Sequence, residues 1–247
     1  MAIAIDQVTD TQAASVDMTN VSSLSWATHD VAGTNRLLVC IVHTLVDNAF
    51  VPNGASAVEW DSTGTPQALA KLIEINASSG GRDSGVEIWY LVNPNAVTNG
   101  TITITLEGTM HVASATLISF TGVDQSTPLD EAGGEGSVDA AGTDWSDTID
   151  TATANAWVIQ GITGKLAASG ITQDNGQTEF NDYDTAGATD TMAWSDAYLG
   201  PIATPGTQTL GVSSMAGDDI AGALMAIKPA ADAAVLRQSR LMTMGIG

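Results

Sequence analysis

The chain has 247 residues, with 28 acidic against 7 basic side chains and a formal net charge of −21. A surface this negative repels phosphate backbones, so nucleic-acid binding is not expected. Hydrophobic residues make up 44% of the chain and charged residues only 14%, which is enough apolar material for a sizeable core and too little charge for a disordered protein.

The sequence has no features of a secretory or membrane-spanning segment. The first residues contain neither a basic region nor a long apolar run, and no apolar stretch approaches the roughly 20 residues that span a bilayer. The single cysteine, Cys40, lies in the apolar run 37–42, which predicts a buried, inert thiol without an intramolecular disulfide. We therefore expect synthesis and folding in a cytoplasm.

Short runs rich in β-branched, aromatic or alternating residues recur along the chain and are separated by turn signals, while helical periodicity is almost absent. In chain order these runs predict strands over residues 2–8, 20–28, 36–46, 55–60, 67–75, 86–92, 101–106, 111–120, 144–149, 155–163, 191–198, 207–213 and 219–227.

Two of these runs are especially informative. In residues 101–106, threonines alternate with Ile102, Ile104 and Leu106, the period-2 pattern of a strand with one wet and one buried face. Residues 36–46 are apolar at nearly every position, which predicts a central strand that is covered on both sides. His43 belongs to this run and is interpreted as a packed core residue.

Two polar stretches are interpreted as loops. Residues 130–142 consist of glycine, alanine and acids with almost nothing to bury, and residues 165–189 are polar, acidic and glycine-bearing. Pro229 ends the last predicted strand. The sequence thus predicts an all-β protein, with a two-sheet antiparallel β-sandwich of the jelly-roll or concanavalin-like type over residues 1–229 and an extended C-terminal tail over residues 230–247.

Several strand segments, taken together, resemble a known family. The segments NRLLVCIVHT, VEIWYLVNP, TITITLEG, ISFTGVDQSTPL and ALMAIKPA, spread over residues 20–229, are similar to β-sandwich domains of bacterial surface proteins and of phage virion proteins such as decoration, tail and fibre components. The pattern is carried chiefly by residues 87–94, 100–106 and 119–128. One turn differs, because Asp61-Ser-Thr-Gly stands where the family commonly has Tyr-Gly-Gly. The resemblance implies the fold and a virion setting, and no shared catalytic residues.

The patterns of common catalytic sites are missing from the sequence. There is no Gly-x-Ser-x-Gly motif, and the three histidines lie in unrelated contexts, so Ser-His-Asp catalysis and zinc binding have no support. Acidic pairs such as Asp130 with Glu131 are explained by the abundance of acids. We do not expect an enzyme.

The sequence offers two candidate binding sites, one for calcium and one for a glycan. Carboxylates suit calcium, and the acidic loop with Asp174, Glu179, Asp182 and Asp184 is the best candidate calcium site, against the alternative of a solvated loop. Of six tryptophans, Trp145 and Trp194 stand next to Ser-Asp dipeptides and are candidate exposed platforms for stacking a glycan, with a core position as the alternative.

The tail combines basic and apolar side chains beyond the last predicted strand. Its candidate partner-binding residues are Arg237, Arg240, Leu241, Met242, Met244 and Ile246. A segment of this kind has no sheet left to pack against, so we expect it to dock on a neighbouring subunit. The leading hypothesis is a structural protein of a phage-like virion, a capsid decoration or a tail or fibre component, that binds copies of itself or other virion proteins. The alternative is a lectin-like carbohydrate-binding module that contacts host-surface glycan.

Overall fold

The computed structural model describes residues 1–10, 21–47, 54–61, 63–78, 82–131, 133–139, 142, 144–165, 171–183, 192–215 and 218–231, and every regular element in these ranges is a β-strand. The first nine strands are β1 (Ala4–Asp10), β2 (Val21–Val31), β3 (Leu37–Asp47), β4 (Ala55–Trp60), β5 (Gln67–Ala68), β6 (Ala70–Ser78), β7 (Arg82–Val92), β8 (Val97–Met110) and β9 (Val112–Thr121). The other eight are β10 (Glu135–Asp139), β11 (Trp145–Thr151), β12 (Ala156–Lys165), β13 (Thr172–Gln173), β14 (Thr178–Tyr183), β15 (Met192–Ile202), β16 (Gly206–Ser213) and β17 (Asp218–Ile227). No helix in these ranges is long and apolar enough to cross a membrane.

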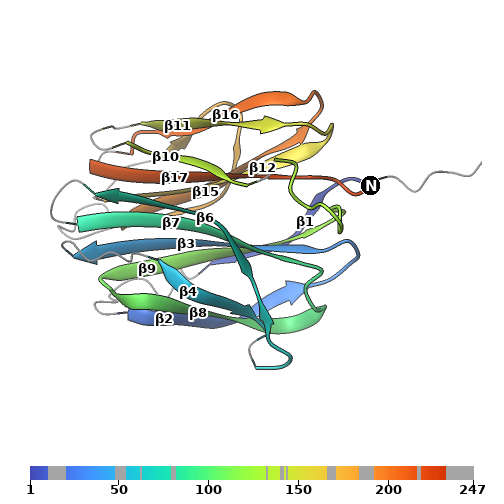
Figure 1. Cartoon of the computed structure of the whole chain (residues 1–247), viewed down its shortest axis with the longest axis horizontal. Helices are drawn as coiled ribbons and strands as arrows, with labels where there is room; N and C mark the ends of the chain where they lie inside the picture. The colour runs from blue at the N-terminus through green and yellow to red at the C-terminus, as the bar shows by residue number, and fades with distance from the viewer. Residues whose placement is uncertain are drawn as a thin grey trace, which may run out of the picture.

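The strands form four antiparallel sheets that lie in a stack (Figure 1). The N-terminal sandwich, β1 to β9, has an outer sheet in the order β2-β8-β4-β5 and an inner sheet in the order β1-β9-β3-β7-β6. The C-terminal sandwich, β10 to β17, has an inner sheet in the order β10-β17-β12-β15-β14 and an outer sheet in the order β11-β16-β13. The predicted all-β, antiparallel sandwich architecture is confirmed, and the structure adds that the sandwich is built twice.

Both sandwiches follow the same path. In each half the first, eighth, third and sixth strands lie side by side in the inner sheet, and the second and seventh pair in the outer sheet, if β5 is counted with β4. This order, in which the chain alternates between two sheets, is the winding of a jelly roll. The fifth strand of each half, β6 or β14, is added at the edge of the inner sheet. The chain is therefore a tandem pair of jelly rolls.

The repeat extends to the register of the inner sheets. The central strand of each sheet has equivalent partners: Val39 pairs with Ile118 and Tyr90, and Ile159 pairs with Met225 and Tyr198. An asparagine with positive φ precedes each central strand, Asn35 at 54° and Asn155 at 64°. Asparagine tolerates this left-handed conformation better than most residues. Both halves thus enter their central strand through the same backbone geometry.

The period-2 alternation of β3 decides how the layers pack. Leu38, Cys40 and Val42 contribute to the core between the two N-terminal sheets. Leu37, Val39 and Ile41 face the other way, into a second core shared with Trp157, Ile159 and Met225 of the C-terminal sandwich. A third core lies between the two C-terminal sheets. As predicted, β3 is central and covered on both faces, and Ile102 and Ile104 of β8 are fully buried.

Three sequence predictions need correction. Residues 130–142, interpreted as a loop, contain β10, which pairs with β17 at the sheet edge. Residues 165–189 contain β13 and β14, which pair with β16 and β15. The single strand predicted over residues 67–75 is two strands in different sheets, β5 and β6. The Leu69 backbone N–H still donates to the Val58 carbonyl of β4, and the chain crosses to the inner sheet after this residue.

Candidate functional site

The two candidate glycan platforms are core residues. Trp145 is 2% exposed and packs between the C-terminal sheets, with its indole N–H donating to the Ser137 carbonyl at 3.2 Å. Trp194 is fully buried and stacks on His43, with ring centroids 5.0 Å apart. A sugar cannot stack on a ring that solvent does not reach, so the platform interpretation of Trp145 and Trp194 is wrong.

The candidate calcium ligands lie only partly within the described residues. Asp174 accepts a hydrogen bond from the Ser213 hydroxyl at 3.1 Å. Burial and the nearby charge of Asp182 raise the pKa of Glu179. Among the described residues no group of three or more acidic, histidine or cysteine side chains could hold a metal ion. Asp184 lies outside the described residues, so a site completed by this residue stays a prediction.

His43 is at the centre of a buried polar group between the two sandwiches. Its Nδ1 lies 2.7 Å from the Thr163 hydroxyl and its Nε2 lies 3.2 Å from Asp196 Oδ2. All three side chains are fully buried, as is Trp194, which covers the imidazole ring. The predicted core position of His43 is confirmed. The constellation has the composition of a proton relay, but solvent and substrate do not reach it, so its role is to join two sheets.

A second polar group lies beside the edge strand β6. Glu87, 1% exposed, accepts hydrogen bonds from the Trp89 indole at 2.7 Å and the Ala55 backbone at 3.0 Å. Lys71 Nζ bridges Glu87 Oε1 at 2.7 Å and Glu74 Oε2 at 2.6 Å. Burial raises the pKa of Glu87. Burial also acts to raise the pKa of Glu74, but the hydrogen bonds from Lys71 and Asn76 and the charge of Lys71 together outweigh it and lower this pKa. These carboxylates are engaged by donors from the fold itself.

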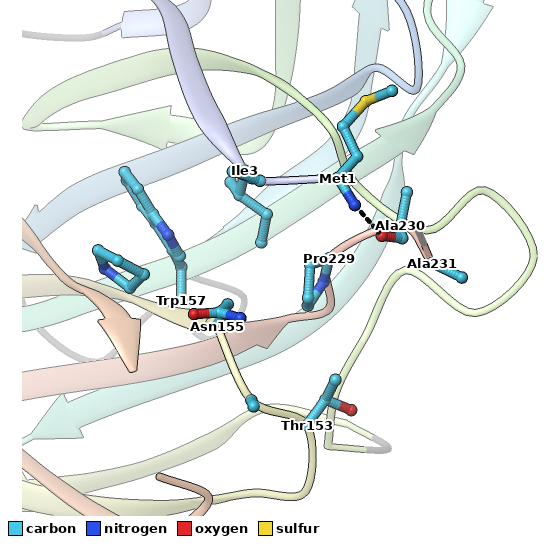
Figure 2. A pocket seen from close by; sticks show the side chains of 11 residues that line it. Met1, Ile3, Thr153, Asn155, Trp157, Pro229, Ala230 and Ala231 are labelled. Carbon is cyan, nitrogen blue, oxygen red and sulfur yellow. Dashed lines mark hydrogen bonds between the residues drawn. The ribbon is translucent and has the colours of Figure 1, made fainter. Parts of the chain in front are cut away.

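A pocket that is open to a ligand lies at the chain termini and is here called the terminal pocket (Figure 2). Its volume is about 560 Å³, and its lining is mostly apolar, with Ile3 from the N-terminus, Trp157 from β12, Pro201 from β15 and Pro229 just after β17. The Met1 ammonium donates to the Ala230 carbonyl at 2.7 Å and ties the two ends of the described chain together at the rim. The volume falls in the range of ligand sites, about 300–1,000 Å³.

A second, acidic pocket lies on the C-terminal sandwich. It has a volume of about 410 Å³ and is lined by Glu131, Glu135, Asp147 and Asp150 together with two threonines and an isoleucine. Residues 150 and 153, which line one pocket each, are three positions apart in the chain. The Asp130 carboxylate holds this segment by accepting the backbone N–H groups of residues 152 and 153 at 2.7 and 3.1 Å.

Sequence reasoning missed both pockets, because their linings come from segments that are far apart in the chain. The tail residues that it did single out, Arg237, Arg240, Leu241, Met242, Met244 and Ile246, lie outside the described residues. The described chain ends at Ala231, which itself lines the terminal pocket. This adjacency of the tail and the pocket is visible only in the fold.

Comparisons with known proteins give no family. No family model matches the chain, and no curated protein matches its sequence. Among solved structures, the crystal structure of the STIV MCP, a viral major capsid protein, aligns with 92% of this chain and 96% of that chain, at 8% sequence identity and a TM-score of 0.26. At this score the alignment adds nothing to the fold or the function argued from the chain itself.

Proposed function

We propose that this chain is a structural protein of a phage-like virion, a capsid decoration or a tail or fibre component, that binds neighbouring subunits through its C-terminal tail. The observation that carries the proposal is the tandem jelly roll, in which two sandwiches of equivalent winding share one continuous core. Jelly rolls recur in viral capsid proteins and in lectins, so the fold is compatible with both classes and the sites must decide between them.

The sites favour the structural role. The polar groups with the composition of catalytic sites, around His43 and around Glu87, are buried and bonded within the fold. We assign them a role in stabilising the fold. The lectin-like alternative relied on Trp145 and Trp194, and both are buried. The described residues form two open pockets, and the apolar one lies at the end where the described chain leaves the fold, which suits assembly with other chains.

The test is the location of the protein in its native source. Particles are purified on a density gradient, washed at high salt and analysed by quantitative mass spectrometry, with a glycan array run on the recombinant protein in parallel. The proposal predicts a fixed ratio of this chain to the other particle proteins and no glycan binding. Recovery only in the unassembled fraction, or saturable binding to one glycan class, contradicts it.

A further inference from the structure

The terminal pocket opens between the two sandwiches, at the end of the molecule where both described termini lie. Trp157 stacks on Tyr198 with ring centroids 4.8 Å apart and is 8% exposed, so it adds only a small apolar surface to the pocket, and Pro201 and Pro229 add further apolar walls. A pocket with such walls suits flexible apolar side chains better than a charged or strongly polar ligand. Methionine and leucine meet this requirement.

We infer that the terminal pocket and the acidic pocket together form the docking site for residues 232–247 of a neighbouring copy of this chain. The inference rests on the proposed assembly role and names the surface that receives the tail. The occupant is this one segment. Its arginines match the acidic pocket, and its apolar side chains match the terminal pocket.

The segment is divided as the site is. Residues 232–247 read DAAVLRQSRLMTMGIG, in which Asp232 and four apolar residues precede Arg237 and Arg240, and an apolar end that contains Leu241, Met242 and Met244 follows them. The site likewise has an acidic part and an apolar part, joined through residues 150–153. A bound peptide can therefore place its arginines among carboxylates while its methionines and leucine enter the apolar part.

Charge complementarity supports the same match. Among the described residues, the acidic pocket is lined by four carboxylates and by no lysine or arginine. Four basic side chains of the described fold already have partners: Arg36 bonds the Pro94 carbonyl, Lys71 bonds Glu87, and Lys165 and Lys228 lie within 4.0 Å of Asp219 and Asp124. The guanidinium fork of arginine suits carboxylates, so Arg237 and Arg240 are the natural counterions that this sequence offers.

The exit direction favours a neighbour over the same copy. The end of the described chain is held in place, because Ala230 donates its backbone N–H to the Gly122 carbonyl at 2.8 Å and accepts from the Met1 ammonium. Figure 2 shows the backbone running from Pro229 to Ala231 away from Trp157 and Asn155. The described end of the chain thus points away from the Trp157 side of its own pocket. Since exit and pocket share one end of the molecule, two copies related by a twofold axis can exchange segments reciprocally.

The first experiment measures binding of the segment in isolation. Deleting residues 232–247 removes no described strand, since β17 ends at Ile227, so the shortened chain 1–231 keeps every sheet. A fluorescent peptide of sequence 232–247 is titrated against it by anisotropy. We expect saturable binding that weakens about tenfold with Asp150→Lys, and weakens as salt rises from about 0.1 to 0.5 M, because rim charges dominate encounter. Glu107→Lys, the same change on exposed β8, is the matched control and should leave affinity unchanged.

Charge reversal on both sides sharpens the test. A peptide with Arg237→Glu and Arg240→Glu should bind the unmodified 1–231 chain about tenfold more weakly and should regain affinity for the Asp150→Lys chain. Ala154→Arg places a bulky cation at the rim of the terminal pocket, where Ala154 is exposed, and should weaken both peptides. Absence of saturable binding, or equal affinity across these variants, overturns the docking site.

The second experiment decides between copies. Sedimentation velocity of the full chain should show a concentration-dependent dimer or larger species, and the 1–231 chain and the full-length Asp150→Lys variant should be monomers. Peptide binding combined with a full chain that stays monomeric means docking within one copy, which overturns the inference. Particle association is scored separately: a chain that co-purifies with particles but does not bind the peptide keeps the virion role and loses this site, and the reverse result keeps the site and removes the virion role.

Discussion

His43 of β3 and Asp196 of β15 meet across the boundary between the two sandwiches, with 3.2 Å between the imidazole Nε2 and Oδ2 of the carboxylate. Thr163 of β12 binds the other ring nitrogen at 2.7 Å, so one histidine of the N-terminal sandwich contacts two strands of the C-terminal one. Buried polar groups stabilise a structure only while they are paired. The two jelly rolls are therefore held together by specific hydrogen bonds of His43 in addition to apolar packing.

Breaking the pair should destabilise the protein strongly. His43→Ala leaves the Asp196 carboxylate buried without its partner, and we expect a loss of about 3–5 kcal/mol in the free energy of unfolding. Asp196→Ala should also destabilise the protein, because it leaves Nε2 of His43 buried without this partner. In urea titrations the double variant should cost less than the sum of the two, by about 1–3 kcal/mol. Simple additivity would show that the contact contributes no coupling between the halves.

Two buried threonines offer a matched comparison for the same interface. Thr163→Val removes the hydroxyl that bonds His43 and should cost about 1–2 kcal/mol. The Thr116 hydroxyl is buried and has no hydrogen-bond partner among the described residues, so Thr116→Val should be neutral or stabilising. Thermal unfolding of the two variants checks the difference, and equal destabilisation of both contradicts it.

The faces of β8 can be tested in the same way. Ile104 is fully buried between the N-terminal sheets, whereas the next residue, Thr105, is exposed. Ile104→Asp should cost several kcal/mol, on the order of 3–5, because an unpaired charge enters the core. Thr105→Asp adds the same charge to the surface and should stay within about 0.5 kcal/mol of the unmodified protein. An Ile104→Asp protein that melts like its parent would refute the face assignment.

Local pattern revealed the strands that bury side chains and failed where pairing relies on the backbone. The alternation of Ile102 and Ile104 with threonines predicted β8, and the apolar run 37–46 predicted the central strand β3. Strand β10, Glu-Gly-Ser-Val-Asp, has no such pattern. It is an edge strand whose Gly136 passes so close to the Gly222 carbonyl that a Cβ there would lie 2.6 Å from the oxygen. Composition cannot signal a strand of this kind.

The sequence did not predict that the sandwich occurs twice. The two halves have equivalent strand order and pairing, but they share few identical residues. The visible traces are few: Asn35 and Asn155 before the central strands, and the dipeptides Tyr90-Leu91 and Tyr198-Leu199 at equivalent pairs beside them. Most core positions exchange one apolar residue for another, which preserves packing and erases identity. The terminal pocket depends on how the N-terminus meets the C-terminal sandwich, and the acidic pocket on how residues 131–150 meet Thr207, so no single stretch of sequence contains either pocket.

Several glycines lie directly against tryptophan rings, where a side chain would not fit. Gly222 is the one that tests the packing most sensitively. A Cβ at Gly222 of β17 would lie 2.2 Å from the ring of Trp145, which is buried and cannot yield. Gly222→Ala should therefore cost about 1–3 kcal/mol through displacement of the indole. Gly108 of β8 has nothing within 4 Å of a Cβ, so Gly108→Ala is the control and should not destabilise. Near-ultraviolet circular dichroism and melting temperature report both effects.

Acid should destabilise the N-terminal sandwich through His29. Its imidazole is fully buried against Trp60, and burial lowers its pKa from 6.5 to about 4 although Asp6 and Asp30 oppose this. The native state then keeps His29 neutral while the unfolded state binds a proton below pH 6.5, so stability falls as the pH drops from about 6.5 to about 4, by roughly 3 kcal/mol. His29→Gln should remove this part of the pH dependence; an unchanged pH profile in the variant contradicts the assignment.

We propose that this chain is an assembled subunit built from two stacked jelly rolls, and electron cryomicroscopy of particles from the native source is the decisive measurement. We expect repeated density in which each copy shows four stacked sheets, with a peptide from a neighbouring copy entering the pocket beside Trp157 and Pro229. Particles whose density leaves no place for a four-layered subunit of this chain would contradict it.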